Sequence, residues 1–364
     1  MPRIACRYLS FGRQMGLCGD KNMKQKLLEL CDIQYGYAFD SAAFTEDSTY
    51  IPLVRIRDVK RGYSETFFSA DYPESYVIHT GDLLVGMDGE FNIARWKCGD
   101  ALLNQRVCKI VAKEGTNEEY LRFALSKALR EIENRTSFVT VKHLSAKELN
   151  KLELQVPFLV DQGRIANTLN KIEQVISKRT VELQKLDELI KARFVEMFGD
   201  PIRNTQNRPT TLFINVVMMQ RGFDLPVQDR QQNGEIPVFG SNGALDYHNE
   251  AKVYGGGVIT GRSGTIGKVY YTEGDYWPLN TSLFSVDTHG NNIIYLAYLL
   301  MLYDLSRFTE GTGVPTLNRN KFHNKPIIDV PLVEQNKFAA FVAQVDKSKS
   351  RRELNYKTMH KLAS

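Results

Sequence analysis

The chain has 364 residues, of which 43% are hydrophobic and 24% are charged, and its formal net charge is +5. A chain of this length exceeds one comfortable hydrophobic core, so two domains are expected. No run approaches the roughly 20 apolar residues of a membrane-spanning helix, and the N-terminus lacks the apolar core of a signal peptide. We therefore expect a cytoplasmic protein without a membrane partner. The small basic excess favours a polyanionic partner but is shared by many enzymes.

The cysteines and the first residues add little chemistry. The five cysteines are odd in number, and no two stand at a C-x-x-C spacing, which argues against a disulfide framework and a zinc site. Residues 1–22 show neither helical nor strand periodicity, whereas organised sequence begins at Met23. We expect residues 1–22 to be unstructured, or Met23 to be the natural start.

Residues 23–157 are predicted to form a first mixed α+β globule. Short apolar stretches such as 51–59 are separated by Gly, Asn and Asp turns, which is typical of strands. Segment 117–134 begins with Asn, a good N-cap, and carries apolar residues at three-and-four spacing. A helix is expected there.

Residues 158–200 are predicted to form one long spacer helix. From Asp161 to Phe198 a heptad seam is apolar at eight of ten positions, and no Gly or Pro interrupts it after Gly163. Such a helix needs a partner helix to be stable in water. The alternative is a core helix of a single globular domain. The apolar seam positions are Ile165, Leu169, Ile172, Ile176, Leu183, Leu186, Ile190 and Met197.

The second half of the chain repeats the first. Residues 201–331 are predicted to form a second globule and residues 332–364 a second spacer helix, which is short or incomplete. The aligned pairs are Leu83–Gly89 with Val258–Gly264, Asn104–Arg106 with Asn280–Ser282, and Val141–Ser145 with Val314–Asn318. A shift of 173 residues places the second seam at Phe338, Val342, Val345, Tyr356 and Met359.

The order globule, helix, globule, helix predicts an antiparallel coiled coil with a pseudo-two-fold axis. The predicted fold class is therefore α+β, with two mixed globules joined by long helices. Two mildly basic globules held at a fixed separation suit duplex DNA, which is a long polyanion with its own two-fold character. Because the globules differ in sequence, the half-sites that they read should differ too.

Several segments make this arrangement resemble the specificity subunit of type I restriction-modification systems, from about residue 24 to the C-terminus. VPFLVDQGRIANTLNKIEQVI follows the first globule and VPLVEQNKFAAFVAQVD follows the second. The run from Glu235 to Tyr271, with EIPVFGSNG and GGGVITGRSGTIGKVYY, and then YWPLNTSLFSV, is similar to a target-recognition domain of that family.

The resemblance implies a set of partners. In that family the two globules read the halves of a bipartite site in double-stranded DNA, and the helices bind two modification subunits. The modification subunits carry S-adenosylmethionine and transfer the methyl group, and the restriction subunits translocate and cut DNA with ATP and Mg²⁺. No cofactor would then be bound by this chain.

Catalytic motifs are missing from the sequence. Gly261–Lys268 superficially resembles a phosphate loop, but Lys268 is followed by Val269 and no helix is expected there, so the G-x-x-x-x-G-K-[ST] spacing is not met. No methyltransferase, Walker or nuclease signature occurs, and the six histidines are scattered. We expect a non-catalytic reader without a metal site. Two alternatives stay open: the DNA-recognition half of a split methyltransferase-endonuclease, and a coiled-coil protein scaffold without a role on DNA.

Reading of bases requires polar side chains on loops, and phosphate contacts require cations or exposed N–H groups. Each candidate could instead be a solvated surface residue or a turn residue, but the set is richer in donors than a scaffold requires. In the first globule the candidates are Tyr35, Tyr37, Arg55, Arg57, Lys60, Arg61, Arg95, Lys97, Asn104 and Arg106. In the second they are Arg221, Ser241, Asn242, Arg262, Ser263, Thr265, Lys268, Asn280, Thr281, Arg319 and Lys321.

Overall fold

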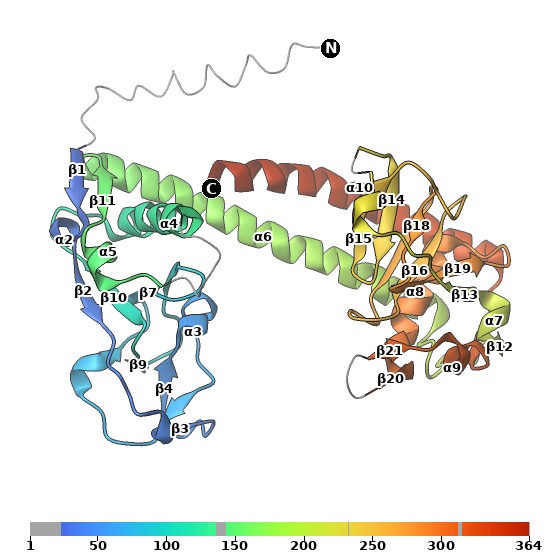
Figure 1. The fold of residues 1–364 in the computed structure, drawn as a ribbon, viewed down its shortest axis with the longest axis horizontal. Helices are drawn as coiled ribbons and strands as arrows, with labels where there is room; N and C mark the ends of the chain where they lie inside the picture. Colours follow the sequence, from blue (N-terminus) through green and yellow to red (C-terminus); the bar gives the residue numbers. More distant parts are fainter. Residues whose placement is uncertain (1–22, 136–142, 232, 312–314, 364) are drawn as a thin grey trace, which may run out of the picture. The chain divides into compact units, whose positions relative to one another are not determined.

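The computed structural model describes residues 23–135, 143–231, 233–311 and 315–363, and in the last helix it describes side chains only up to Ser350 (Figure 1). The segment 1–22 discussed above lies outside the described residues. The chain divides into two compact units, which we describe separately. Unit 1 runs to Val175 and includes the chain's end from His360, and unit 2 comprises Ile176–Met359. Within the described ranges, none of the helices combines the length and the apolar character that a membrane crossing needs.

Unit 1 is built on a four-stranded antiparallel sheet with strand order β2-β10-β7-β8. Helix α4 buries Leu121, Leu125 and Leu129 in the same core as this sheet, at the four-residue spacing of one helix face. Strand β1 pairs with β11, which joins the two ends of the globule. These elements are β1 (Met23–Lys26), α2 (Leu27–Leu30), β2 (Cys31–Tyr35), β7 (Leu83–Gly86), β8 (Asn92–Arg95), β10 (Val107–Ala112), α4 (Glu118–Arg135), α5 (Ala146–Asn150) and β11 (Glu153–Val156).

A second sheet of unit 1 consists of five short strands in the order β3-β5-β4-β9-β6. Strands β4 and β9 pair in parallel, and the other neighbours in this sheet pair antiparallel. Leu53 and Leu102 lie opposite each other and are fully buried. The elements are η1 (Ser41–Ala43), β3 (Phe44–Thr45), β4 (Ile51–Val54), α3 (Ile56–Arg61), β5 (Phe67–Phe68), η2 (Glu74–Tyr76), β6 (Val77–Ile78) and β9 (Ala101–Leu103).

Unit 2 repeats the main sheet of unit 1 with strand order β13-β19-β16-β17. A three-stranded sheet β15-β14-β18 and the pairs β12-β22 and β20-β21 complete it. Its strands are β12 (Thr210–Leu212), β13 (Met218–Arg221), β14 (Ile236–Gly240), β15 (Gly243–His248), β16 (Gly257–Gly261), β17 (Val269–Thr272), β18 (Trp277–Pro278), β19 (Ser282–Asp287), β20 (Thr309–Glu310), β21 (Thr316–Leu317) and β22 (Pro326–Ile328). Its short helices are α7 (Phe213–Val216), η3 (Val227–Asp229), α8 (Ile293–Tyr303), η4 (Leu305–Phe308) and α9 (Arg319–His323).

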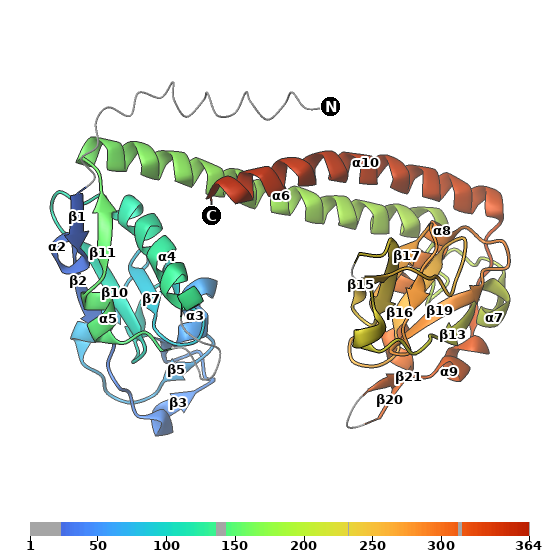
Figure 2. The ribbon, with the colours of Figure 1, turned by 45° about the horizontal axis from the view of Figure 1, so that its top comes forward.

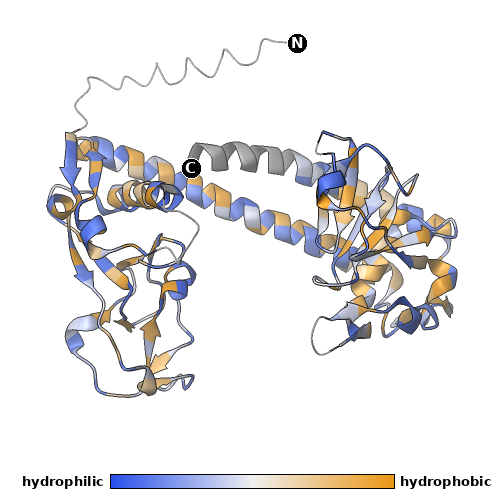
Figure 3. Ribbon diagram, in the orientation of Figure 1, coloured by the Kyte–Doolittle hydropathy of each residue, from blue (hydrophilic) through white to orange (hydrophobic). Residues whose placement is uncertain are grey.

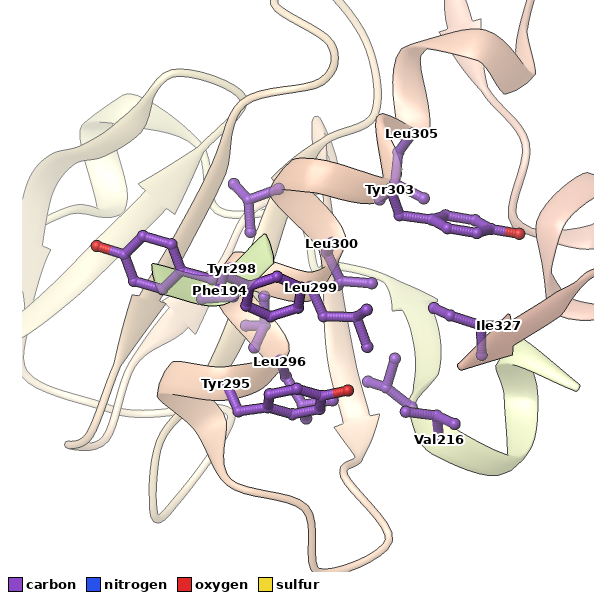
Figure 4. Packing of buried hydrophobic residues seen from close by; sticks show 14 of the residues in the cluster. Phe194, Val216, Tyr295, Leu296, Tyr298, Leu299, Leu300, Tyr303, Leu305 and Ile327 are labelled. Atoms are coloured by element: carbon purple, nitrogen blue, oxygen red, sulfur yellow. The ribbon is translucent and has the colours of Figure 1, made fainter. Parts of the chain in front are cut away.

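The core of unit 2 forms around helix α8, which is apolar on all sides and mostly buried. Figure 4 shows Phe194, which comes from the long helix α6 (Leu159–Phe198), lying among the α8 side chains. The Phe194 ring stacks on Tyr295 with 5.7 Å between ring centroids. The end of α6 is therefore part of the unit 2 core and not only a connection to it.

The predicted internal repeat is confirmed down to single hydrogen bonds. Gln162, in the first turn of α6, accepts from the backbone N–H of Asn117 at 2.8 Å and donates to the Pro157 carbonyl. Gln335, in the first turn of α10 (Leu332–Ala363), accepts from the N–H of Asn292 at 2.8 Å and donates to the Val330 carbonyl. Each long helix is therefore tied by a matched buried glutamine to the start of a core helix, which is α4 in unit 1 and α8 in unit 2.

Replacing Gln335 with leucine is expected to lower the free energy of unfolding of unit 2 by about 1–3 kcal/mol, because a buried N–H and a carbonyl lose their partner. Trp277 lies in unit 2 and the other tryptophan, Trp96, in unit 1. Urea unfolding followed by Trp277 fluorescence in a Trp96→Phe background therefore measures the change. The exposed neighbour Lys337, changed to alanine, should shift stability by less than about 0.5 kcal/mol. An unchanged midpoint for Gln335→Leu would contradict the structural role.

Within unit 2, α6 and α10 pack against each other in antiparallel orientation (Figure 2). Phe338, near the start of α10, contacts Phe198, at the end of α6, with 5.8 Å between ring centroids. Further along, Lys349 of α10 pairs with Asp187 of α6 at 2.5 Å. The predicted fold class, α+β with an antiparallel pair of long helices, is confirmed.

The predicted seam is only partly followed. Figure 3 shows apolar residues recurring between polar ones along α6. Ile165 is 38% exposed, and the neighbouring Ala166 is buried instead, so the prediction for Ile165 was wrong. At the other end the buried positions are Ile190, Phe194 and Phe198, a four-residue spacing that includes two phenylalanines outside the predicted seam.

The remaining seam positions divide into three groups. Those of α10 that the structure describes are buried: Phe338, Val342 and Val345. Those in the middle and at the end of α6 are half-buried: Leu169, Ile172, Ile176, Leu183, Leu186 and Met197. Two lie outside the described side chains: Tyr356 and Met359.

Candidate nucleic-acid interface

Three arginines of unit 2 line one cavity of about 360 Å³. Arg221 ends β13, Arg262 directly follows β16, and Arg319 begins α9. Asn318 and Asn320 also line the cavity, and the Asn318 side chain accepts from the N–H of Asn320. We call this cavity the arginine pocket.

The backbone around Arg262 is fixed from both sides. Its N–H donates to the Thr281 carbonyl at 2.9 Å, and its own carbonyl accepts from the N–H of Leu317 at 2.8 Å. Gly261 precedes it, and a Cβ there would lie only 1.7 Å from the Thr265 carbonyl oxygen, so the chain can fold back here only with glycine. The backbone that carries the Arg262 side chain is therefore held in place. The side chain donates to the Asn280 carbonyl at 3.4 Å.

The arginine pocket carries uncompensated positive charge. Among the described residues, none forms an ion pair with Arg221, Arg262 or Arg319. The one carboxylate in the lining, Glu310, pairs with Lys321 at 2.8 Å, and this hydrogen bond lowers the pKa of Glu310. An arginine fork in such a pocket can bind a phosphate or the acceptor edge of a guanine.

Further predicted donors of unit 2 lie on the neighbouring loops. Ser263 forms a backbone bridge with Thr316, which lines the arginine pocket. Lys268 donates to the Asn242 side chain at 3.1 Å, which joins the β14–β15 and β16–β17 loops. The three other predicted donors are on the same loops or next to them: Ser241, Thr265 and Thr281.

Unit 1 brings its repeat-matched segments together in the same way. The N–H of Met87 donates to the Arg106 carbonyl at 2.9 Å, and the N–H of Leu144 donates to the Met87 carbonyl at 2.7 Å. The N–H of Gln105 donates to the Tyr37 carbonyl at 2.8 Å. Tyr37 is 43% exposed and packs on Phe39 and Tyr76, so an aromatic face lies beside the Gln105–Arg106 turn.

A wider groove of about 870 Å³ in unit 1 is lined by Arg55 and Arg57 together with Ser64 and Thr66. Most of the predicted cations of unit 1 form ion pairs with carboxylates, unlike the arginines of the arginine pocket. Lys60 pairs with Glu90 at 3.1 Å, Arg61 with Glu65 at 3.6 Å, Arg57 with Asp58 at 3.5 Å and Arg106 with Asp88 at 3.5 Å. Lys97 lies with its aliphatic stem against Gly62.

Two sequence regions match one family model, which describes the type I restriction modification DNA specificity domain. The matched residues are 20–188 and 216–356. The chain belongs to this family. It is similar to the specificity subunit of the type I restriction enzyme EcoBI of Escherichia coli, with 38% identity over 173 residues. That alignment covers 47% of this chain and spans 36% of the length of the relative.

Other matches cover nearly the whole chain. A Mycoplasma pneumoniae protein named as a type I specificity subunit is 23% identical over 311 residues, which are 81% of this chain and 82% of that protein. The crystal structure of the type I restriction-modification S subunit from M. genitalium has a TM-score of 0.58 at 14% identity and covers 94% of this chain and 93% of that one. A chain from a structural study of type I system assembly has a TM-score of 0.52 at 16% identity and covers 94% and 95%. The solved structures support the fold.

Four candidates in the two specificity domains form hydrogen bonds or ion pairs within the chain. Tyr35 donates to the Asn150 side chain at 2.7 Å, and burial raises the pKa of Tyr35 to about 12. Arg95 binds Glu118, Glu119 and the Gly81 carbonyl. Both side chains are therefore engaged in contacts within unit 1. Asn104 is 7% exposed and caps its own turn, and Asn280 donates to Asp224.

Sequence reasoning missed Asp88 and His143, which contact Arg106. The signal was present, because both lie in segments that align between the two specificity domains. The scattered spacing of the six histidines does not indicate this contact. Among the described residues, no group of His, Cys, Asp and Glu side chains could hold a metal ion.

Proposed function

We propose that the chain reads a bipartite, asymmetric site in duplex DNA, with unit 1 reading one half-site and unit 2 the other. One observation carries the proposal: the two units build the same backbone bridges and place different side chains on them. Ser263 and Thr316 of unit 2 occupy the bridge that Asp88 and His143 occupy in unit 1. Base identity is read by side chains, so the same backbone with different side chains can recognise different sequences.

The proposed role is non-catalytic, with the chemistry on partner subunits. A methyltransferase subunit would supply S-adenosylmethionine, and an ATP-dependent restriction subunit with Mg²⁺ would cut. The supporting feature is a pair of exposed apolar segments at the starts of the two long helices. Phe158 and Val160 are 68% and 67% exposed in unit 1, and Val333 is 67% exposed at the matching place in unit 2. Two matched apolar segments suit two copies of one partner chain.

The test is to co-express the chain with its methyltransferase partner and to map genomic methylation. A bipartite, asymmetric methylated motif should appear and should vanish when this gene is deleted. Methylation by the isolated chain with S-adenosylmethionine would instead support a split enzyme. Methylation of the same motif without this chain would overturn the proposal.

The long helices should set the gap between the half-sites. Inserting one heptad into each of α6 and α10 keeps the seam in phase and adds roughly 10 Å of helix. The unspecified gap of the methylated motif should therefore lengthen by about three base pairs, at roughly 3.4 Å each. An insertion of two residues in each helix is the control, because at 3.6 residues per turn it rotates the seam by about 200° and should abolish methylation. A gap that stays the same after the heptad insertions would contradict the spacer role.

A further inference from the structure

Three charged or polar side chains of unit 1 meet although they are far apart in sequence. The Arg106 Nη1 group donates to Nε2 of His143 at 3.0 Å, and Arg106 Nε lies 3.5 Å from the Asp88 carboxylate. His143 Nδ1 is hydrogen-bonded to the other oxygen of that carboxylate. In the Nδ1–H tautomer the ring donates to Asp88 and accepts from Arg106 at Nε2, so the three side chains are linked to one another. We call these residues the Asp88–His143–Arg106 cluster.

Arg106 occupies an uncommon backbone conformation. Its φ is +72°, in the left-handed region that glycine and asparagine enter most readily. The turn is fixed by two hydrogen bonds, from the N–H of Val107 to the Asn104 carbonyl and from the N–H of Met87 to the Arg106 carbonyl. An arginine at a position that favours glycine points to a use for its side chain.

The fold does not require this cluster. Unit 2 forms the matching bridge with Ser263 and Thr316, and the matching hydrogen bond from Leu317 to Arg262, without a charged group on the bridge. The same backbone therefore forms with two small hydroxyl residues. The charged side chains of unit 1 are therefore not needed to form this backbone bridge.

The Arg106 side chain stays accessible within the cluster. The Arg106 side chain is 51% exposed, whereas that of Asp88 is only 23% exposed. The contacts to Asp88 and His143 engage Nε and Nη1, and no hydrogen bond from a described residue occupies Nη2. An arginine held in this way loses less rotamer freedom when it binds. Guanine presents O6 and N7 in the major groove as acceptors for the exposed donors of such an arginine.

We propose that Arg106 is a specificity-determining residue that binds a guanine in the half-site of unit 1, and that Asp88 and His143 are positioning residues that fix its geometry. The proposal rests on the DNA-reading function above and deepens it. Tyr37 is exposed and its carbonyl accepts from the N–H of Gln105, so it adjoins this turn and can contact the neighbouring sugar or base.

The test uses the full chain co-expressed with its methyltransferase partner, with the methylated motif mapped for each variant. Arg106→Lys keeps the charge but loses the fork, so one G of the unit 1 half-site should become degenerate. Asp88→Asn should lower the preference for the same G by about 5- to 100-fold, and Asp88→Glu should restore part of it. Asp32→Asn, whose carboxylate is 74% exposed on β2, is the matched charge control and should leave the motif unchanged.

The outcomes separate this proposal from the function on which it rests. If the native chain directs no methylation, the DNA-reading function fails. If the native chain gives a motif but Arg106→Lys leaves every position as selective as before, or weakens all positions equally, the assignment of Arg106 fails. Degeneracy at an A·T position would assign the cluster to a different base and would likewise overturn the guanine contact. Thermal unfolding of each complex identifies a variant that fails to fold, and Arg106→Lys then decides in place of Asp88→Asn.

Discussion

Replacing Phe194 with alanine is expected to lower the free energy of unfolding of unit 2 by about 3–5 kcal/mol. The side chain is fully buried between Phe198, Tyr295 and Phe338, with ring centroids at 4.9, 5.7 and 5.3 Å. Removing it leaves a cavity at the point where both long helices meet α8. The expected result is therefore loss of the α6–α10 pairing together with loss of the unit 2 core.

Urea unfolding followed by Trp277 fluorescence in the Trp96→Phe background measures this change. Val195 lies next to Phe194 on α6 and is 41% exposed, so Val195→Ala is the matched control and should cost less than about 0.5 kcal/mol. If Phe194→Ala costs no more than Val195→Ala, the end of α6 is a detachable linker and not part of the unit 2 core.

Replacing Arg221, Arg262 and Arg319 together with alanine is expected to weaken binding of the assembled complex to its cognate duplex by on the order of 10³-fold or more. The three side chains share one pocket and have no carboxylate partner among the described residues. They therefore need not break an ion pair before they bind DNA. Arg57, Lys60, Arg61 and Arg106 of unit 1 are paired, so their loss should have smaller effects on general affinity.

Single variants assign each arginine of the pocket to a base or to a phosphate. Arg262→Ala should cost about 1–3 kcal/mol on the cognate site alone if Arg262 binds a base. If it binds a phosphate, all sequences should weaken alike and the slope of log K against log salt should fall by roughly 0.9. Arg203 is exposed in the turn after α6 and does not line the pocket, so Arg203→Ala controls for net charge. Unchanged affinity of the triple variant would remove the arginine pocket from the interface.

A buried histidine, His323, lies beside the arginine pocket. His323 is buried and accepts a hydrogen bond from the N–H of Met219 at 3.2 Å, and burial together with the charge of Arg319 lowers the pKa of His323. A neutral, hydrogen-bonded histidine beside the pocket stabilises α9 against β13. It therefore fixes the start of α9, from which Arg319 extends.

The repeat, the family and the two long helices follow from the sequence alone. These properties are written along the chain: heptad spacing in Asp161–Phe198, matched glutamines at 162 and 335, and aligned turn segments in the same order. Periodicity is local, so one sequence is enough to read it. Even here the seam was displaced at both ends, because the globules cover the faces of α6 that present Ala166 and Phe194.

Which of the predicted donors are exposed depends on the folded structure. The sequence gives no reason to rank Tyr37 above Tyr35, or Arg106 above Arg95. In the structure Tyr35 and Arg95 bond to other side chains of unit 1. Tyr37 and Arg106 are about half exposed. Whether a guanidinium meets a carboxylate depends on side chains brought together from distant segments, such as Asp88, Arg106 and His143. Local pattern carries no record of such contacts, because they are set by strand register and by turns that long-range pairing fixes.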